Sequence, residues 1–334
     1  MADSENIRIK DIAHMAGVSI GTVDRVLHNR GRVSKKNLQK INEVLAQVNY
    51  QPNIIARSLS SKKIYQLVVI IPNFTIGEYW EHISKGIDRA LADFKQYHVN
   101  VEKRYFDQFN EISFKNAIEG IKWENVDGVL IAPLFAELTR LLSKQLDTFH
   151  IPYVYIDSDL EREQRMTFVG TNSQAGGRIA AKLISKNIEV TDSILIAQIQ
   201  HIGEESTQAI NRQHGFLEYL HEKKFQGRVH NADLHLMDTA SNEHILNNIF
   251  HNYPQIKAAV NFNSKAYVVG EYLAQKKRHD ICLVGYDLIE KNEILLQNGY
   301  IEALIAQHPN SQGYEGIRAL CNHLIFAKQS ERTI

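Results

Sequence analysis

Polar and charged side chains follow a series of apolar runs between residues 65 and 334, at the points where those runs end. They are Asn73, Asp157, Asn172, Asn263 and Asp287, together with Arg212 early in a helical pattern and Gln307 after "EALIA". Carboxylates and amides can each take pairs of hydroxyl groups, and an arginine donates bidentately. The aromatic pair Tyr79 and Trp80 could cover the apolar C–H face of a sugar ring. This set of side chains predicts a binding site for a polyhydroxylated small molecule.

Catalysis is the alternative use of the same residues. A glycosidase needs two carboxylates that flank the scissile bond, and Asp157 with Asp287 could take those roles. The sequence has no nucleophile elbow, no P-loop and no HExxH pair, and "GTNSQAGG" lacks the GxGxxG pattern. Cys282 and Cys321 form no CxxC motif. We therefore expect a binding protein without metal or cofactor, and a sugar-processing enzyme remains the alternative.

The apolar runs alternate with amphipathic helical patterns in two successive series. The first series extends from "QLVVIIP" at 66–72 to "IPYVYID" at 151–157, and the second from "MTFVGTN" at 166–172 to "ICLVGYD" at 281–287. Apolar strands that alternate with helices predict parallel sheets covered by helices on both faces. Ligands of such sheets bind at the carboxyl ends of the strands.

Residues 65–334 should therefore form an α/β bilobed body of two doubly wound parallel-sheet subdomains. The expected N-lobe spans about 65–160 and 290–320, and the expected C-lobe spans about 161–289 with the C-terminal segment. The binding residues would then lie in the cleft between the lobes.

The first 64 residues differ in charge from the rest of the chain. They carry 11 Lys and Arg against five Asp and Glu, a net charge of +6, and because the whole chain is neutral the remainder carries −6. A basic head on an acidic body suggests that the head meets a polyanion. A solvated charged face is the alternative explanation.

The head has the pattern of a helix-turn-helix unit. Apolar residues recur at helical spacing over 9–16, and "AGVS" then interrupts the pattern. Gly17 can adopt the positive φ of a tight turn, and Ser19 can cap a second helix. A third helical pattern follows Ser34. Residues 1–51 are therefore expected to form an all-α helix-turn-helix DNA-binding domain.

The stretch "IKDIAHMAGVSIGTVDRVL", followed by "VSKKNLQKINEVLAQVNYQPNIIARSL", resembles the DNA-binding head of LacI-family transcription regulators. The resemblance implies that the second helix enters the major groove, with Ile20, Gly21 and Arg25 at base-reading positions. An arginine can bridge O6 and N7 of guanine, and an isoleucine can contact a thymine methyl, whereas glycine only allows close approach. Ordinary helix packing is the alternative for Ile20 and Thr22. The residues expected to position the phosphate backbone are Thr22, His28 and Arg32.

Residues 52–64 are expected to form a hinge helix or linker. Pro52 ends the preceding helix, and Asn53 can cap a new turn. In the family the equivalent helix orders on operator DNA and wedges a leucine into the minor groove, and Leu59 stands at that position. A plain linker whose Leu59 packs on the body is the alternative.

The body also resembles LacI-family effector domains and the related periplasmic sugar-binding proteins. The matching stretches include "DGVLIAP", "FVGTNSQAGGRIAA", "RQHGF", "VGYD" and "IAQHPNSQG". The resemblance places six residues at effector-contact positions, namely Asp157, Asn172, Arg212, Asn263, Asp287 and Gln307. It also matches Tyr79 and Trp80 to the aromatic pair after the first strand. The family's usual Asn–Asp pair is replaced here by Asn263–Ser264, which removes one carboxylate.

Asp24 departs from the family pattern, in which a small hydroxyl residue usually stands at this place in the second helix. A carboxylate cannot donate to a phosphate and is repelled by it. Asp24 could pair with Arg25 or His28 and hold that side chain in place, or it could accept from N4 of cytosine in the major groove. We favour the pairing.

The expected protein is a homodimeric transcription regulator that binds a pseudo-palindromic double-stranded operator, because two-fold protein symmetry requires two-fold DNA symmetry. We favour the prediction that it represses carbohydrate-utilisation genes and that its effector is a sugar or sugar derivative. Activation instead of repression, and corepression instead of induction, stay open. A stand-alone sugar-binding protein would lack the basic head.

No apolar run reaches the ~20 residues of a membrane helix, and no apolar segment near the N-terminus suggests export, so a cytoplasmic location is expected.

Overall fold

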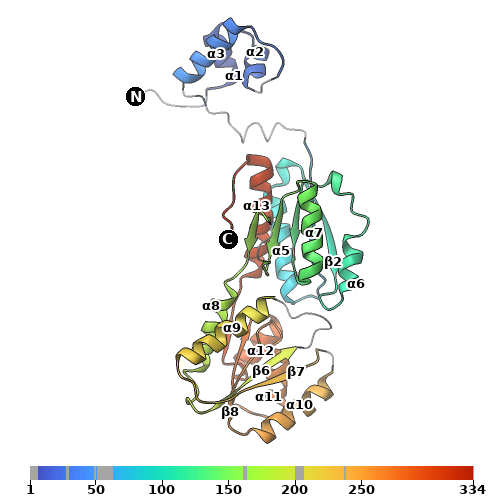
Figure 1. Ribbon diagram of the computed structural model, residues 1–334, viewed down its shortest axis with the longest axis vertical. Coiled ribbons are helices and arrows are strands. Elements are labelled where there is room, and N and C mark those ends of the chain that lie inside the picture. Colours follow the sequence, from blue (N-terminus) through green and yellow to red (C-terminus); the bar gives the residue numbers. More distant parts are fainter. Residues whose placement is uncertain are drawn as a thin grey trace. The chain divides into compact units, whose positions relative to one another are not determined.

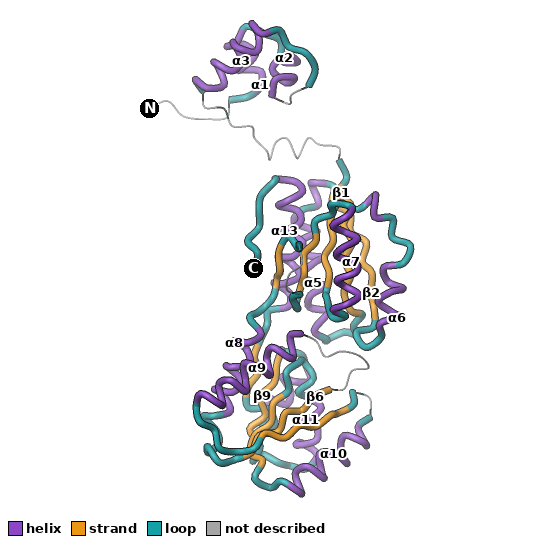
Figure 2. Tube along the Cα trace, viewed as in Figure 1, coloured by secondary structure: helices purple, strands orange, loops and turns teal. Residues whose placement is uncertain are grey.

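The computed structural model of the protein describes residues 7–27, 30–48, 50, 63–160, 164–199, 207–236 and 238–333 (Figure 1). The chain divides into two units, Met1–Ser60 and Ser61–Ile334. The described part of the first unit is helical, and the second unit contains two α/β lobes (Figure 2). The predicted combination of a helical head and a bilobed α/β body is confirmed. Within the described residues, no helix has the length and apolar character needed to cross a membrane.

The head contains α1 (Ile9–Ala16), α2 (Ile20–Leu27) and α3 (Lys35–Gln47). Gly17 ends α1 with φ 64°, as the tight turn requires. The Ser19 hydroxyl accepts from the Thr22 backbone N–H at 3.2 Å, and Ser34 caps α3 by accepting from the Asn37 N–H at 3.3 Å. The three helices enclose a small apolar core formed by Ile12, Ala13, Ala16, Val23, Ile41 and Val44.

The N-lobe is built on a parallel sheet of order β2-β1-β3-β4-β5. Its strands are β1 (Tyr65–Pro72), β2 (Val99–Phe106), β3 (Gly128–Ile131), β4 (Tyr153–Ile156) and β5 (Thr167–Val169). Helices α5 (Tyr79–Asp93) and α13 (Pro309–Phe326) pack against each other beside the sheet, and α6 (Glu111–Ile118) and α7 (Ala136–Thr148) cover its other face (Figure 1). The central strands are buried along their whole length, as expected for a parallel sheet covered on both faces.

The C-lobe repeats this arrangement with a parallel sheet of order β10-β9-β8-β6-β7. Its strands are β6 (Ser193–Ile199), β7 (Val229–Leu234), β8 (Ile256–Val260), β9 (Cys282–Tyr286) and β10 (Ala303–Ile305). One apolar cluster joins the sheet to α10 (Thr239–Asn252), α11 (Tyr267–Gln275) and α12 (Glu290–Gln297), and another joins it to α8 (Ser173–Ile184) and α9 (Thr207–Glu222). When the five strands of each lobe are numbered in chain order, both sheets have the order 2-1-3-4-5.

The lobe boundaries expected from the sequence need three corrections. Strand β5 belongs to the N-lobe because it pairs with β4, whereas the C-lobe was expected to begin at about 161. Helix α12 and strand β10 belong to the C-lobe, since Leu295 joins the C-lobe core and β10 pairs with β9. The C-terminal segment lies on the N-lobe, where the Phe168 N–H donates to the Arg332 carbonyl at 3.1 Å. The chain therefore passes between the lobes after Val169 and again after Ile305.

Each passage leads into a helix, α8 in the C-lobe and α13 in the N-lobe. This helix packs closely on the helix that follows the first strand of the same lobe, α9 after β6 or α5 after β1. An added Cβ at Gly86 in α5 would lie 1.9 Å from the Asn310 carbonyl oxygen of α13. In the C-lobe, an added Cβ at Gly177 in α8 would lie 1.8 Å from the Arg212 carbonyl oxygen of α9. Glycine is therefore required for the backbones of these helix pairs to approach so closely. The α8–α9 contact also fixes the position of Arg212.

Candidate functional site

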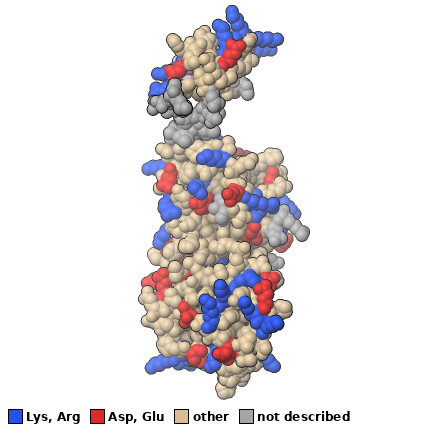
Figure 3. Space-filling model, turned by 90° about the vertical axis from the view of Figure 1, so that its left-hand side faces the viewer, with Lys and Arg blue, Asp and Glu red and all other residues tan. Residues whose placement is uncertain are grey.

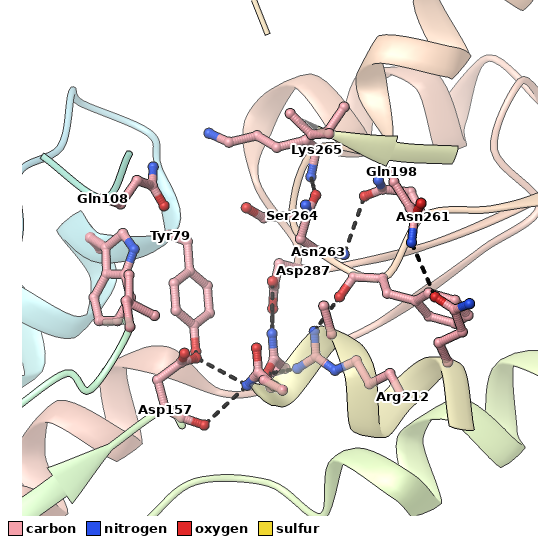
Figure 4. A pocket seen from close by; sticks show the side chains of 18 of the residues that line it. Tyr79, Gln108, Asp157, Gln198, Arg212, Asn261, Asn263, Ser264, Lys265 and Asp287 are labelled. Carbon is pink, nitrogen blue, oxygen red and sulfur yellow. Dashed lines mark hydrogen bonds between the residues drawn. The ribbon is translucent and has the colours of Figure 1, made fainter. Parts of the chain in front are cut away.

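A cavity of about 110 Å³ lies where the two lobes meet (Figure 4). Its N-lobe wall is contributed by the start of α5 and by the loops that follow β2, β3 and β4, and its C-lobe wall by β6, α9 and the loops after β8 and β9. Of the nine residues predicted from the sequence to bind the ligand, all except Asn73 and Asn172 line the cavity. The seven lining residues are Tyr79, Trp80, Asp157, Arg212, Asn263, Asp287 and Gln307.

Tyr79 and Asp157 form the N-lobe side of the polar cluster. Tyr79 is the first residue of α5, and its hydroxyl donates to Oδ1 of Asp157 at 2.6 Å. The ring of Trp80 packs edge-on against that of Tyr79, with 5.3 Å between centroids. Both aromatic side chains are buried and line the cavity, so an apolar surface stands beside the carboxylate.

Gln307 connects the residues of the C-lobe side. Its side-chain nitrogen donates to both oxygens of Asp287, at 3.1 and 2.9 Å. Its side-chain oxygen accepts from the Arg212 guanidinium, which also donates to the Phe262 carbonyl at 2.6 Å. The guanidinium carbon of Arg212 lies 4.1 Å from the centroid of the Tyr286 ring. Arg212 is 1% exposed, so this buried cation is fixed on several sides before any ligand enters.

Burial determines the protonation of the two carboxyl groups. Burial raises the pKa of Asp287 to about 7, although Arg212 and the hydrogen bonds from Gln307 act in the opposite direction. Burial also raises the pKa of Asp157, against the hydrogen bond from Tyr79 and the charge of Arg212. The pKa of Tyr79 is raised well above its usual value by burial and then by the two carboxylates, so its hydroxyl stays protonated and donates. The cluster thus offers both donors and acceptors, which is what a polyhydroxylated ligand needs.

Gln208 and Lys265 join the walls of the cavity, and neither residue was predicted from the sequence. The side-chain nitrogen of Gln208, in α9, donates to the Asp157 carbonyl at 3.0 Å and to the Gln307 side chain at 3.0 Å. The Lys265 ammonium lies 3.1 Å from Oε1 of Glu78, the residue before α5. Two features of the sequence could have identified these residues. Gln208 lies at the start of a helix, and Lys265 directly follows Asn263–Ser264.

Asn73 and Asn172, both predicted to contact a ligand, lie outside the cavity lining. Asn73 is exposed, and its N–H donates to the Phe106 carbonyl at 2.8 Å, which extends the pairing of β1 with β2. Asn172 is exposed and caps α8, because its side chain accepts from the Ala175 N–H at 2.9 Å. Asn172 therefore serves as an N-cap, which satisfies a backbone donor at the helix end, and its contact with a ligand stays a prediction.

The head presents most of its predicted DNA-contact residues on its surface. Ile20 is 56% exposed, and an added Cβ at Gly21 would meet nothing within 4 Å. Arg25 and Arg32 are exposed, and Figure 3 shows Lys and Arg side chains on the surface of the head. Thr22 is half-buried, and its hydroxyl lies 2.8 Å from that of Ser19. Asp24 is half-buried and interacts with another group of the chain. Three further predicted residues, His28, Asn53 and Leu59, lie outside the described residues.

Two family models match the chain. The family described as "Periplasmic binding protein domain" matches residues 67–328, and the family described as "Bacterial regulatory proteins, lacI family" matches residues 8–53. A solved structure assigned to the LacI transcriptional regulators, from Bacteroides fragilis, is 33% identical in sequence with a TM-score of 0.75. That similarity covers 81% of this chain and 94% of the other.

Curated relatives carry names of transcriptional regulators. The ribose operon repressor of Halalkalibacterium halodurans is 25% identical over 298 residues, which cover 86% of this chain and 82% of the relative. The catabolite control protein A of Streptococcus mutans is 28% identical over 187 residues. That match spans 56% of this chain and about half, 54%, of the relative's length.

Proposed function

This chain belongs to the LacI family of transcriptional regulators, and we propose that it represses carbohydrate-utilisation genes under the control of a sugar-like effector bound between its lobes. The observation that carries this proposal is the position of the buried polar cluster. Gln307 follows the passage of the chain from β10 into the N-lobe, and it contacts both Arg212 and Asp287. A ligand that bonds to this cluster more tightly in one arrangement of the lobes than in another shifts the balance between them, which is the requirement for allosteric control.

The DNA-binding half of the proposal rests on α2. Arg25 and Ile20 are exposed on that helix, and Gly21 leaves open space beside them. We infer that Arg25 reads a guanine, that Ile20 contacts a thymine methyl, and that Arg32 binds phosphate. The chain acts as a homodimer on a pseudo-palindromic operator, because one head covers only a half-site.

The effector half of the proposal rests on the chemistry of the cavity. Asp157, Asp287 and Gln307 accept and donate hydroxyl hydrogen bonds, and Trp80 and Tyr79 cover the C–H face of the ring. The relative named ribose operon repressor points to the same class of ligand. Whether the effector releases or strengthens DNA binding depends on which state it binds more tightly.

Binding without turnover is the proposed activity. Asp157 already accepts from Tyr79 and Asp287 already accepts from Gln307, so both carboxylates are engaged in fixed hydrogen bonds. In a glycosidase one carboxylate would instead have to attack the sugar or activate water. Release of product from any sugar incubated with the purified protein would contradict this proposal.

The decisive experiment is a mobility-shift assay on operator DNA with and without candidate sugars, using wild type, Arg25→Ala and Arg212→Ala. The Arg25 variant should bind operator more weakly and keep sugar binding in calorimetry. The Arg212 variant should bind operator and lose the response to sugar. Sugar-insensitive operator binding by the wild type across all sugars would contradict effector control.

A further inference from the structure

Lys265 gives the cavity a charged feature that a neutral sugar does not need. The residue is 7% exposed and lines the C-lobe wall. Figure 4 shows it on the opposite side of the cavity from Asp157 and Arg212. A buried ammonium must have an anionic partner, because its desolvation is costly. Its partner in the structure is Glu78 of the N-lobe, at 3.1 Å.

The loop that carries Lys265 holds no carboxylate. Asn263 and Ser264 precede Lys265 directly, and both side chains are neutral. Both Ser264 and Lys265 line the cavity. This wall therefore carries the ammonium group of Lys265, paired with Glu78, whereas the opposite end carries the carboxyl groups of Asp157 and Asp287 beside Arg212.

We propose that the effector is an anionic monosaccharide derivative whose carboxylate or phosphate is bound by Lys265 while its hydroxyl groups bind the Asp157, Arg212 and Asp287 cluster. This inference rests on the proposed function, since it specifies the ligand of the same cleft. The anion binds at the Lys265 end because at the other end it would face two carboxyl groups.

Glu78 occupies the position beside Lys265 that the anionic group of the effector would take. One of its carboxylate oxygens meets Lys265, and the other accepts from the Thr75 N–H at 3.0 Å. Partial burial acts to raise the pKa of Glu78, but the Thr75 hydrogen bond and the charge of Lys265 outweigh it and lower the pKa. The Glu78 side chain is 33% exposed, against 9% for Lys265. Glu78 can therefore turn to water at small cost, whereas the lysine has to remain in the wall.

The size of the cavity limits the ligand to about one sugar ring. At about 10–15 Å³ for each water-sized position, a volume of about 110 Å³ holds roughly seven to eleven such positions. That volume is too small for a disaccharide, and the charged group of the ligand has to take the space beside Lys265 that Glu78 occupies. The side chain of Gln108 also lines this region and can donate to the same anionic group.

Calorimetry on the full chain with matched ligand pairs tests the proposal. The pairs are galactose with galacturonate, glucose with glucuronate, glucose with glucose 6-phosphate, and ribose with ribose 5-phosphate. In at least one pair the anion should bind 10-fold or more tightly than its neutral parent. Whether carboxylates or phosphates give that result identifies the source of the charge.

Three variants separate anion binding from other roles of Lys265. Lys265→Met should abolish the preference for the anion, and Glu78→Gln should strengthen anion binding several-fold, because the competing carboxylate is gone. Lys291→Met is the matched control, since it removes a lysine 4.4 Å from the Tyr267 ring in the same lobe but not in the cavity lining, and it should change nothing.

Distinct outcomes overturn the proposal. If neutral sugars bind and their anionic counterparts bind no more tightly, the anion site is wrong and sugar control stands. If Glu78→Gln and Lys265→Met weaken neutral and anionic ligands alike, the ion pair only holds the lobes closed. If no member of the panel binds the cleft, sugar control itself fails together with this inference.

Discussion

Asp157 and Asp287 occupy equivalent places in the two lobes. Each follows the fourth strand of its sheet, each has a positive φ (70° and 68°), and each backbone N–H donates at 3.0 Å to the last residue of the fifth strand, Val169 or Ile305. Each lobe thus contributes one carboxyl group at the same position of its fold. The two groups lie on opposite walls of the cavity, near the points where the chain passes between the lobes. The candidate binding cluster is a product of that repetition.

The positive φ at Asp157 predicts that Asp157→Ala lowers the stability of the protein more than Asp157→Asn does. Asn tolerates the left-handed region and Ala does so poorly, at a cost of about 1–2 kcal/mol. Asp157→Ala also removes the carboxylate that accepts from the Tyr79 hydroxyl, whereas Gln208 keeps the Asp157 carbonyl and the Gln307 side chain as acceptors. Chemical denaturation should find Asp157→Ala less stable than Asp157→Asn by about 2 kcal/mol. Both variants should lose sugar affinity, and equal stability of the two would contradict the backbone argument.

The raised pKa of Asp287 predicts that stability falls as the pH rises. The carboxyl has a pKa of about 7 in the folded chain against its ordinary value of 3.8, so the folded state binds the extra proton between those values. Between pH 6 and 8 this group should lower the free energy of unfolding by about 1 kcal/mol. Asp287→Asn should remove that part of the pH dependence in thermal unfolding. Asp280→Asn is the control, because the pKa of Asp280 is lowered by the hydrogen bond from Arg278 and it does not titrate in this range.

The close approach of α8 and α9 predicts opposite effects of two adjacent substitutions. An added methyl at Gly177 would lie 1.8 Å from the Arg212 carbonyl oxygen, whereas one at Gly176 would have the Tyr286 hydroxyl at 3.4 Å as its nearest neighbour. Gly177→Ala should destabilise the body by about 3 kcal/mol and weaken effector binding through Arg212. Gly176→Ala should be neutral or stabilise α8 by up to about 1 kcal/mol. Equal unfolding midpoints for the two variants would contradict the packing argument.

Periodicity predicted the strands and most helices of the body, but it missed α12, β10 and α13. The segment that forms α13 contains Pro309, Gly313 and Gly316, which in isolation are typical of a loop. An added Cβ at Gly313 would lie 2.1 Å from the Ile83 carbonyl oxygen of α5, so a tertiary contact explains that glycine. Local pattern cannot reveal a contact with a helix more than 200 residues earlier in the sequence.

The candidate cavity was predictable where a side chain's direction is set by the strand that it follows. Asp157 and Asp287 were predicted in this way, whereas Gln307 was predicted from its place in the loop after "EALIA". Asn73 also follows a strand, but its backbone continues the ladder and its side chain is exposed. Lys265 was missed because its role depends on the facing lobe, which places Glu78 opposite it.

Arg25 predicts the sequence specificity of the head. Removal of a guanine-reading arginine should cost about 1–3 kcal/mol and relax the preference at one position of each half-site. Arg25→Ala should therefore bind operator about 10- to 100-fold more weakly in a fluorescence titration. Arg32→Ala should weaken binding to all sequences equally, as expected for a phosphate contact, and the same behaviour in Arg25→Ala would contradict base reading.

Substitution of Asp24 should change the affinity of the head for DNA without changing the DNA sequence that it prefers. The residue is half-buried and interacts with another group of the chain. Asp24→Ser would remove a negative charge from a surface that faces phosphates and add a hydroxyl donor, and binding should tighten several-fold at low salt. Selection of binding sites from a random DNA pool should return the same consensus for wild type and variant. A consensus that loses a cytosine in the variant would instead establish Asp24 as a reader of cytosine N4.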